Sequence, residues 1–332
     1  MRNVVMLIRP LCVALLCALW AGAPVGSAGR QDQSGESASP SWVRVTERAN
    51  FEPRDTADGF VYNGKMWMSN GYFGSEAAAY HDLWCSDDGV SWTLVNAATP
   101  YDDYSGMVVF QDKIWAIGRT VWSSTDGEHW TRISAKTPFG TGRSGEVVAF
   151  RGRIWRLGVD DDVWSTTDGL TWTQATERAP YGKRQAAALT AFNDRLWIMG
   201  GAIERTNRPR ETTYPALTSF NDVWSSPDGI RWTRVVRHAP WSRRMWAKAK
   251  VHGGRIWLVG GFDNAGDRKN FNDTWFTEDG KRWRRWVSGS PYLARHAPTL
   301  YDFDGGLWIV AGNSWPLLND VWRLTLHART DQ

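Results

Sequence analysis

Arginine recurs at one position of a repeated segment, and this spacing could provide a site for anions. The position lies 13 residues before a repeated tryptophan and is held by Arg54, Arg184, Arg244 and Arg295. Arg143 is one residue off, and Asp102 takes the place in another copy. Guanidinium groups hold a carboxylate, phosphate or sulfate by forked hydrogen bonds, so these arginines predict an anion-binding ring. The alternative is structural, with each arginine bonded to neighbouring backbone carbonyls.

Charged and aromatic residues alternate along the segments that follow the arginines. Counting by twos from the arginines gives one face of a predicted strand. That face carries Tyr104, Trp246, Asp58, Glu146, Lys248, Thr299, Thr190, Lys250 and Tyr301. Charges do not suit a packing surface, so we expect this face to line a water-filled channel. In an enzyme, Glu146 or Asp58 would act as acid or base beside Lys248 and Tyr301, whereas simple solvation is the alternative.

Two tryptophan motifs organise the chain around these residues. The first, typified by "VWSSPDGIRWT" (223–233), occurs five times, and its first half returns at 321–327. The second, typified by "RIWLVGG" (255–261), precedes each copy, and its tryptophans stand 48, 40, 42, 60 and 51 residues apart. Self-similarity at such a period indicates a repeat architecture, here of six units.

Each unit has the pattern of four short antiparallel strands. Tight-turn residues such as Asn63-Gly64 join the first two strands, and an Asp-Gly turn joins the last two. Four strands per repeat is typical of a propeller blade. We therefore predict an all-β, six-bladed propeller over 42–328, in which the N-terminal strand completes the last blade and closes the ring. The expected blades are 54–95, 102–133, 143–175, 184–235, 244–286, and 295–326 with 42–46.

The repeat resembles the Kelch-repeat propellers, including the galactose-oxidase-like group. The resemblance covers 42–328 and rests on Gly200-Gly201, on Gly260-Gly261 and on the paired aromatic positions. Other copies keep only one of the two glycines, and tryptophan replaces the more usual tyrosine. The Asp-Gly turn is also similar to the Asp-box of sialidase propellers, with one residue fewer. The copper-binding tyrosines and histidines of the galactose oxidases cannot be placed here, so we expect no cofactor.

Most of the 23 tryptophans belong to the repeat, because eighteen fall at equivalent positions. A residue that every blade needs is best explained by packing between blades. The tryptophans that depart from the pattern in the mature chain are Trp241, Trp246, Trp286 and Trp315, and a binding surface would use Trp241, Trp246 and Trp315.

The loops between second and third strands are uneven in length. They are short at 119–120 and 159–161 but long at 202–221 and 262–272. Long loops in compact folds frequently carry function, so we expect a wall beside an open side at blades two and three. Residues expected to overlook the channel from this wall are Arg205, Arg208, Arg210, Tyr214, Arg268 and Trp315.

The N-terminus has the layout of a secretory signal peptide over 1–28, followed by a polar leader over 29–41. Losing Arg2 and Arg9 leaves 37 of the 39 basic side chains against 35 acidic ones, a net charge of +2. That small surplus argues against nucleic-acid binding. Cys85 would be the single cysteine of the mature chain, which excludes an intrachain disulfide and a cysteine-based zinc site.

Two functions from different classes fit these patterns. The first is a secreted or periplasmic binding module, monomeric and without a membrane span after cleavage, that recognises an anionic glycan or a protein at the loop face. Its expected ligand residues are Arg54, Arg143, Arg184, Arg244, Arg295, Trp246, Tyr104 and Arg210. The second is a carbohydrate-active enzyme, an epimerase, lyase or hydrolase for an acidic sugar, at the same channel mouth. The histidines show no metal-ligand spacing, so no metal is expected.

Overall fold

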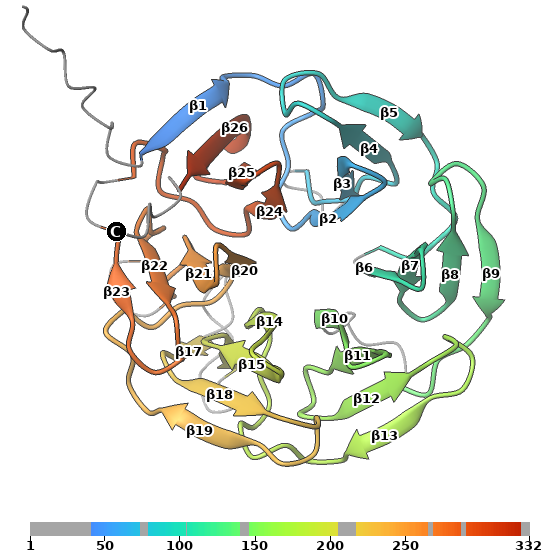
Figure 1. Cartoon of the computed structure of the whole chain (residues 1–332), viewed down its shortest axis with the longest axis vertical. Helices are drawn as coiled ribbons and strands as arrows, with labels where there is room; N and C mark the ends of the chain where they lie inside the picture. The colour runs from blue at the N-terminus through green and yellow to red at the C-terminus, as the bar shows by residue number, and fades with distance from the viewer. Residues whose placement is uncertain are drawn as a thin grey trace, which may run out of the picture. The chain divides into compact units, whose positions relative to one another are not determined.

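Six four-stranded antiparallel sheets are arranged in a ring, as predicted (Figure 1). The computed structural model describes residues 41–73, 79–103, 105–139, 146–204, 217–264, 268–286 and 290–326. Within these ranges every regular element is a strand, so the class is all-β. Each tryptophan repeat supplies the strands of one blade, so the blades follow one another along the chain.

The first three blades each use four successive strands, with the first strand innermost. Blade one has β2 (Asp58–Tyr62), β3 (Lys65–Ser69), β4 (Leu83–Ser86) and β5 (Thr93–Asn96). Blade two has β6 (Gly106–Phe110), β7 (Lys113–Ile117), β8 (Val121–Ser124) and β9 (Thr131–Ser134). Blade three has β10 (Glu146–Phe150), β11 (Arg153–Leu157), β12 (Val163–Thr166) and β13 (Thr173–Thr176).

The last three blades vary this plan. Blade four has β14 (Ala188–Phe192), β15 (Arg195–Met199), β18 (Val223–Ser226) and β19 (Thr233–Val236). Its long loop starts and ends as a separate ladder of β16 (Ala202–Glu204) and β17 (Leu217–Ser219). Blade five has β20 (Lys248–His252), β21 (Arg255–Val259), β22 (Thr274–Thr277) and β23 (Arg284–Arg285). Blade six has β24 (Thr299–Phe303), β25 (Gly306–Asn313), β26 (Leu317–Thr325) and β1 (Trp42–Thr46).

The ring is closed by the N-terminal strand, as the sequence predicts. β1 pairs antiparallel with β26, with Trp42 opposite Leu324. This pairing gives blade six its fourth strand. The two ends of the propeller are thereby hydrogen-bonded in one sheet, and the first and last blades share no open edge.

The repeated tryptophans pack one blade against the next. In the second strands, each indole N–H donates to the carbonyl five residues earlier, as Trp155 does to Phe150 at 3.0 Å. The ring lies beside the Asp-Gly turn of the following blade, where a Cβ on Gly229 would collide with Trp155. Gly229 also has a φ of 73°. The turn therefore requires glycine for both its backbone and its neighbour, and scaffolding explains the repeat.

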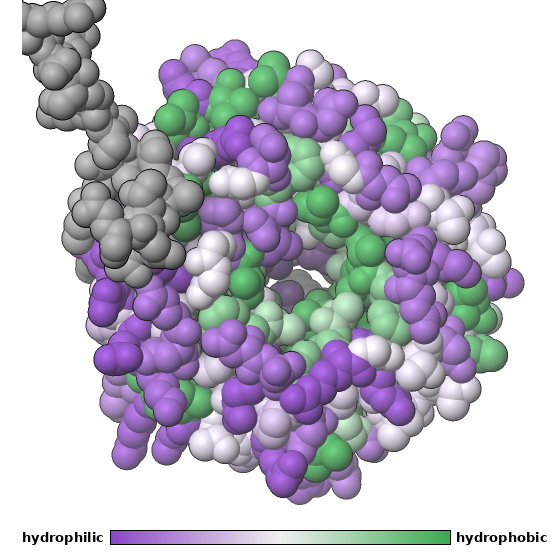
Figure 2. Space-filling view, in the orientation of Figure 1, coloured by the Kyte–Doolittle hydropathy of each residue, from purple (hydrophilic) through white to green (hydrophobic). Residues whose placement is uncertain are grey.

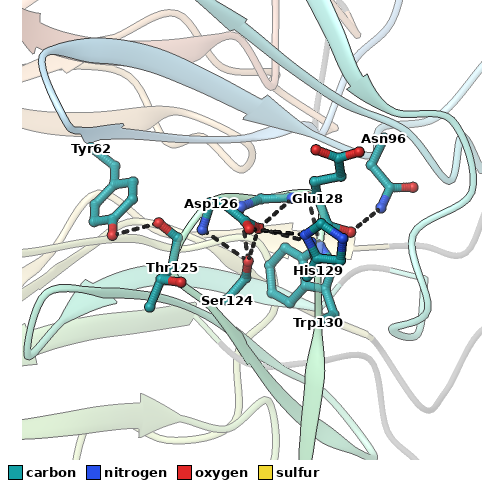
Figure 3. Close-up of polar contacts among 9 residues, drawn as sticks. Tyr62, Asn96, Ser124, Thr125, Asp126, Glu128, His129 and Trp130 are labelled. Carbon is teal, nitrogen blue, oxygen red and sulfur yellow. Dashed lines mark hydrogen bonds and ion pairs between the residues drawn. The ribbon is translucent and has the colours of Figure 1, made fainter.

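The Asp-Gly turn is itself held by side-chain hydrogen bonds, shown for blade two in Figure 3. Asp126 accepts the backbone N–H groups of Glu128 and His129, and Ser124 Oγ accepts that of Gly127 at 2.8 Å. The backbone and ring bonds from His129 hold the pKa of Asp126 at about 2. From blade one, Tyr62 donates to the Thr125 carbonyl at 2.9 Å, so the turn also joins neighbouring blades.

Candidate functional site at the channel mouth

The central channel opens into a cavity of about 910 Å³. Its walls come from the innermost strands, from the segments that precede them and from the loops between second and third strands. Figure 2 shows the hollow at the ring centre, with apolar residues around much of its rim in that view. Pockets of this size, mostly apolar with a few placed polar groups, are typical ligand sites.

The four arginines of the ring are buried frame residues. Arg54, Arg184, Arg244 and Arg295 have exposed fractions of 0%, 5%, 1% and 0%. Each guanidinium forks onto an aspartate two residues before a third-strand tryptophan, as Arg244 does onto Asp273 at 2.6 and 2.9 Å. The same group donates to the carbonyl that ends the second strand, here Gly260 at 2.8 Å. The other pairs are Arg54–Asp82, Arg184–Asp222 and Arg295–Asp320.

These bonds occupy the donors that an anion would need. The geometry agrees with the structural alternative for the arginines. They donate to backbone carbonyls, as that alternative expects, and also to aspartate carboxylates. The aspartates also accept the indole N–H of the nearby tryptophan, as Asp273 does from Trp275 at 2.7 Å. Each unit thus links strand two, strand three and the entering loop. A function at the channel mouth has to be built from other side chains.

Blades two and three complete the frame differently. In blade three Arg156, on the second strand, pairs with Asp162 at 3.1 Å and lies 4.1 Å from the centre of the Phe139 ring. In blade two Asp102 replaces the arginine and accepts from Arg119 and Thr120. Three of the expected ligand residues, Arg143, Tyr104 and Arg210, lie outside the described residues.

The channel face carries a cluster of Asp58, Glu146 and Lys248 from three different blades. Lys248 Nζ lies 3.7 Å from Glu146 Oε1 and 4.0 Å from Asp58 Oδ1. Burial alone would lower the pKa of Lys248, but attraction to the two carboxylates outweighs it and raises that pKa. Burial raises the pKa of Glu146, against the attraction of Lys248. The expected acid, base and ammonium groups are brought together, but they pair with one another.

Lys250 lies on the same strand as Lys248 and also lines the cavity. Burial lowers its pKa, while Asp302 and Asp58 oppose that effect. Within the described ranges Lys250 makes no ion pair, in contrast to Lys248. An ammonium in this position has donors available for an anionic group of a ligand.

Tyr301, the fourth residue considered for catalysis, is not on the channel surface, and that expectation is wrong. The side chain is fully buried, in a hydrophobic cluster with Met66, Met68 and Trp308. Burial raises the pKa of its hydroxyl well above the usual value. Gly59 of blade one permits this packing, because a Cβ there would collide with the Tyr301 ring. Without a side chain at Gly59, the tyrosine turns into the gap between blades.

An aromatic wall bounds one side of the cavity and consists of Trp246, Phe262, His296 and Trp315. The His296 ring stacks on Trp246 at 5.0 Å and lies 4.8 Å from Trp315. Phe262 packs edge-on against Trp315 at 5.1 Å. Trp315 is 54% exposed, so about half of this residue remains accessible. Among the off-pattern tryptophans, Trp246 and Trp315 are thus the two at the site.

Trp241 and Trp286 serve the frame instead. Trp241 is 1% exposed and packs edge-on against Trp283 at 6.0 Å. Trp286 packs against Trp257 at 5.4 Å. The expectation that Trp241 contributes to a binding surface is therefore wrong, because its side chain is buried.

Four residues with left-handed backbone conformation border the mouth of the cavity. Thr56, Ala186, Trp246 and Ala297 occupy equivalent positions and have φ values of 57°, 55°, 56° and 47°. Their amides bond around the ring, with Thr56 N to Ala297 O, Ala297 N to Trp246 O, and Trp246 N to Ala186 O at 3.2, 2.8 and 2.9 Å. Such strained φ values persist only where the surrounding structure enforces them, and they cluster at ligand sites.

Asp55, His296, Asn270 and Asn313 are the polar residues that sequence reasoning missed. Asp55 and His296 immediately follow Arg54 and Arg295 and occupy equivalent positions in adjacent blades. The histidines showed no useful spacing along the chain, and Asp55 had no motif. The sequence signal that could have found Asp55 and His296 is their position directly after a repeated arginine. Consecutive residues of an extended chain point in opposite directions, so these two side chains point away from the buried arginines.

Comparison with known proteins supports the fold alone. No protein-family model matches the sequence, and no curated protein matches it. Among solved structures, that of YjhT aligns with a TM-score of 0.66, covering 86% of this chain and 98% of that chain at 13% identity. The chain is therefore a six-bladed β-propeller, and its function has to be argued from its own side chains.

The described residues contain neither a candidate metal site nor a candidate membrane-spanning helix. No three His, Cys, Asp or Glu side chains in those ranges are placed to hold a metal ion. The same ranges contain no helix of the length and apolar character needed to cross a membrane.

Proposed function

We propose that the protein is a Kelch-type propeller that binds an anionic glycan at the mouth of its central channel. The observation that carries this proposal is that Trp315, with an exposed aromatic face, and Lys250, without an ion pair in the described ranges, line the same cavity. An aromatic face accommodates the C–H face of a sugar ring. An ammonium with available donors suits a carboxylate or sulfate.

Binding is favoured over catalysis by the arrangement of the charged cluster. An enzyme would converge a carboxylate and a second proton-transfer group on one open point. Here Lys248 links Glu146 to Asp58, and the hydroxyl of Tyr301 is buried elsewhere. The cluster therefore supports a charged wall for a ligand more than a proton-transfer site.

The proposal includes export of a monomer. It rests on the signal-peptide pattern over 1–28 and on the polar segment that follows. Expression of the full chain in a bacterial host, followed by fractionation and intact mass, tests this part. We expect a mature protein outside the cytoplasm that begins near Gly29 and behaves as a monomer in size-exclusion chromatography.

Thermal-shift and calorimetric titration of the mature protein test the binding. The probes are galacturonic acid, glucuronic acid, a chondroitin sulfate disaccharide and, as neutral controls, galactose and cellotetraose. Acidic probes are expected to raise Tm by mass action. Lys250→Met should remove the preference for acidic over neutral probes, whereas Lys113→Met, at an exposed hairpin, should not. If no glycan binds and a protein partner is captured by the same face, the proposal fails.

A further inference from the structure

Two buried polar atoms face each other in the cavity wall without touching. His296 Nε2 lies 3.8 Å from Asp55 Oδ2, and both side chains are 6% exposed. That separation is too long for a hydrogen bond. We call these two atoms the acceptor pair, because the hydrogen bonds of their neighbours assign an acceptor role to both.

The amide of Asn270 determines which nitrogen of His296 carries hydrogen. Asn270 Nδ2 donates to the Asn313 backbone carbonyl at 2.9 Å, so its Oδ1 is the atom that faces His296. Oδ1 is an acceptor, and it lies 2.8 Å from His296 Nδ1. The hydrogen of a neutral imidazole must therefore be on Nδ1, which leaves a lone pair on Nε2.

The amide of Asn313 does the same for Asp55. Asn313 Oδ1 accepts the Trp315 backbone N–H at 2.8 Å, so its Nδ2 donates to Asp55 Oδ2, also at 2.8 Å. Thr56 donates to the other carboxylate oxygen at 2.7 Å. Burial raises the pKa of Asp55, but both of these hydrogen bonds favour the ionised form.

The surroundings of His296 keep its ring neutral at physiological pH. Its neighbours within the wall are the aromatic rings of Trp246, Phe262 and Trp315, and burial lowers its pKa to about 4. A neutral ring with hydrogen on Nδ1 presents only an acceptor toward Asp55. Two acceptors in a low-exposure wall need donors from elsewhere.

We propose that the acceptor pair is the subsite for two adjacent hydroxyl groups of the bound glycan, one donating to Asp55 Oδ2 and the other to His296 Nε2. This inference rests on the proposed function and specifies its ligand as a glycan with a free vicinal diol beside the sugar face that stacks on Trp315. Vicinal hydroxyls supply two O–H donors side by side. A single ether or methylated oxygen cannot replace either donor.

Proton position in the ligand-free protein is the first test. Uniform ¹⁵N labelling of the histidines, with His296→Gln to assign the signal, reports which ring nitrogen is protonated at pH 7. We expect Nδ1 protonated and Nε2 bare. A proton on Nε2 would overturn the inference, because His296 would then donate to Asp55 itself, and glycan binding at the wall could still stand.

Calorimetry with galacturonic acid and its 2-, 3- and 4-deoxy analogues is the second test. Asp55→Asn replaces an acceptor by an amide that can donate to Nε2, so we expect affinity to fall by about tenfold, the loss of one good charged hydrogen bond. The loss on removing a diol hydroxyl should be large in the wild type and largely absent in Asp55→Asn. Thr93→Val, on the exposed outer strand β5 and away from the cavity, should change affinity less than twofold.

The two proposals fail in different ways. Wild-type binding that Asp55→Asn leaves unchanged, at an unchanged Tm, overturns the diol subsite alone. Absence of binding by every glycan overturns the proposed function and the subsite with it. Unchanged discrimination among the deoxy analogues in Asp55→Asn also overturns the subsite, because those hydroxyls would then be recognised elsewhere.

Discussion

Arg295 and His296 are consecutive residues with opposite surroundings, and Arg54 and Asp55 repeat the contrast in the next blade. The arginines point into their own blades, where an aspartate and a carbonyl satisfy the guanidinium. Asp55 and His296 point to the cavity, where two acceptors face each other at 3.8 Å. One side of this short segment is complete within the protein, and the other is completed only by a ligand or by water.

The contrast follows from what each group needs when water is removed. A guanidinium cannot lose its charge, so it is buried only with partners that use its donors. An imidazole and a carboxylate beside a cavity can remain incomplete because donors can reach them from the channel. The frame and the site thus use neighbouring residues without sharing hydrogen bonds. Substitutions in the frame and in the site test this separation.

Arg244→Ala should damage the frame most. It leaves the largely buried Asp273 of blade five with a charge and no guanidinium, and breaking such a buried pair costs about 3–5 kcal/mol. Urea unfolding followed by tryptophan fluorescence measures the loss. Arg234→Ala, on the outer strand β19, is the matched control and should cost less than about 1 kcal/mol. Equal small losses in both variants would contradict the frame role.

Gly229→Ala should cost about 2–3 kcal/mol, because it adds a collision with Trp155 to the strain of a positive φ. Gly152→Ala separates the two effects. Gly152 has a similar φ of 70°, with nothing within 4 Å of the added Cβ, so strain alone should cost about 1 kcal/mol. Equal losses at the two positions would show that the tryptophan does not press on the turn.

Asp126→Asn should lower Tm at neutral pH, with an effect that disappears in acid. The folded-state pKa of Asp126 is about 2, below its value in the unfolded chain. The stability from this ionised carboxylate is therefore fully present above about pH 4 and lost as pH falls through about 2. Thermal unfolding from pH 7 to pH 2 checks this, and a Tm difference that persists at pH 2 would contradict it.

Trp315→Ala should leave the frame almost untouched and act on binding. The ring is 54% exposed, so we expect a stability change below about 0.5 kcal/mol. If the ring supports a sugar face, affinity for galacturonic acid should fall by about tenfold or more. Leu170→Ala, an equally exposed apolar residue of a blade-three turn, is the control and should bind normally. Matching affinities in the two variants would contradict a role of the aromatic wall in glycan binding.

The architecture could be predicted because the same sequence motifs recur in all six units. Eighteen tryptophans at equivalent positions, the hairpin signals and the unpartnered "SWVRV" segment lead to six blades and to closure by β1. The partner of each arginine was also within reach. An aspartate precedes the third-strand tryptophan by two residues in five of the six units, so a repeated acid matches the repeated base.

The site was harder to predict because it depends on departures from the repeat. Left-handed residues such as Thr56 and Trp246 interrupt the alternation of an extended chain. Counting by twos from the arginines therefore does not predict reliably which later side chains face the channel. Tyr301 left the channel because Gly59 made room for it in the adjacent blade. His296 and Asp55 approach each other only because blades six and one are joined in the closed ring.

Calorimetric titration of galacturonic acid into the mature protein, beside Lys250→Met and Lys113→Met, tests whether the cavity recognises an anionic glycan. We expect binding to the wild type and to Lys113→Met, and loss of the preference for galacturonic acid over galactose in Lys250→Met. Binding that is absent, or that shows the same preference in Lys250→Met, would contradict the placement of glycan recognition in the cavity.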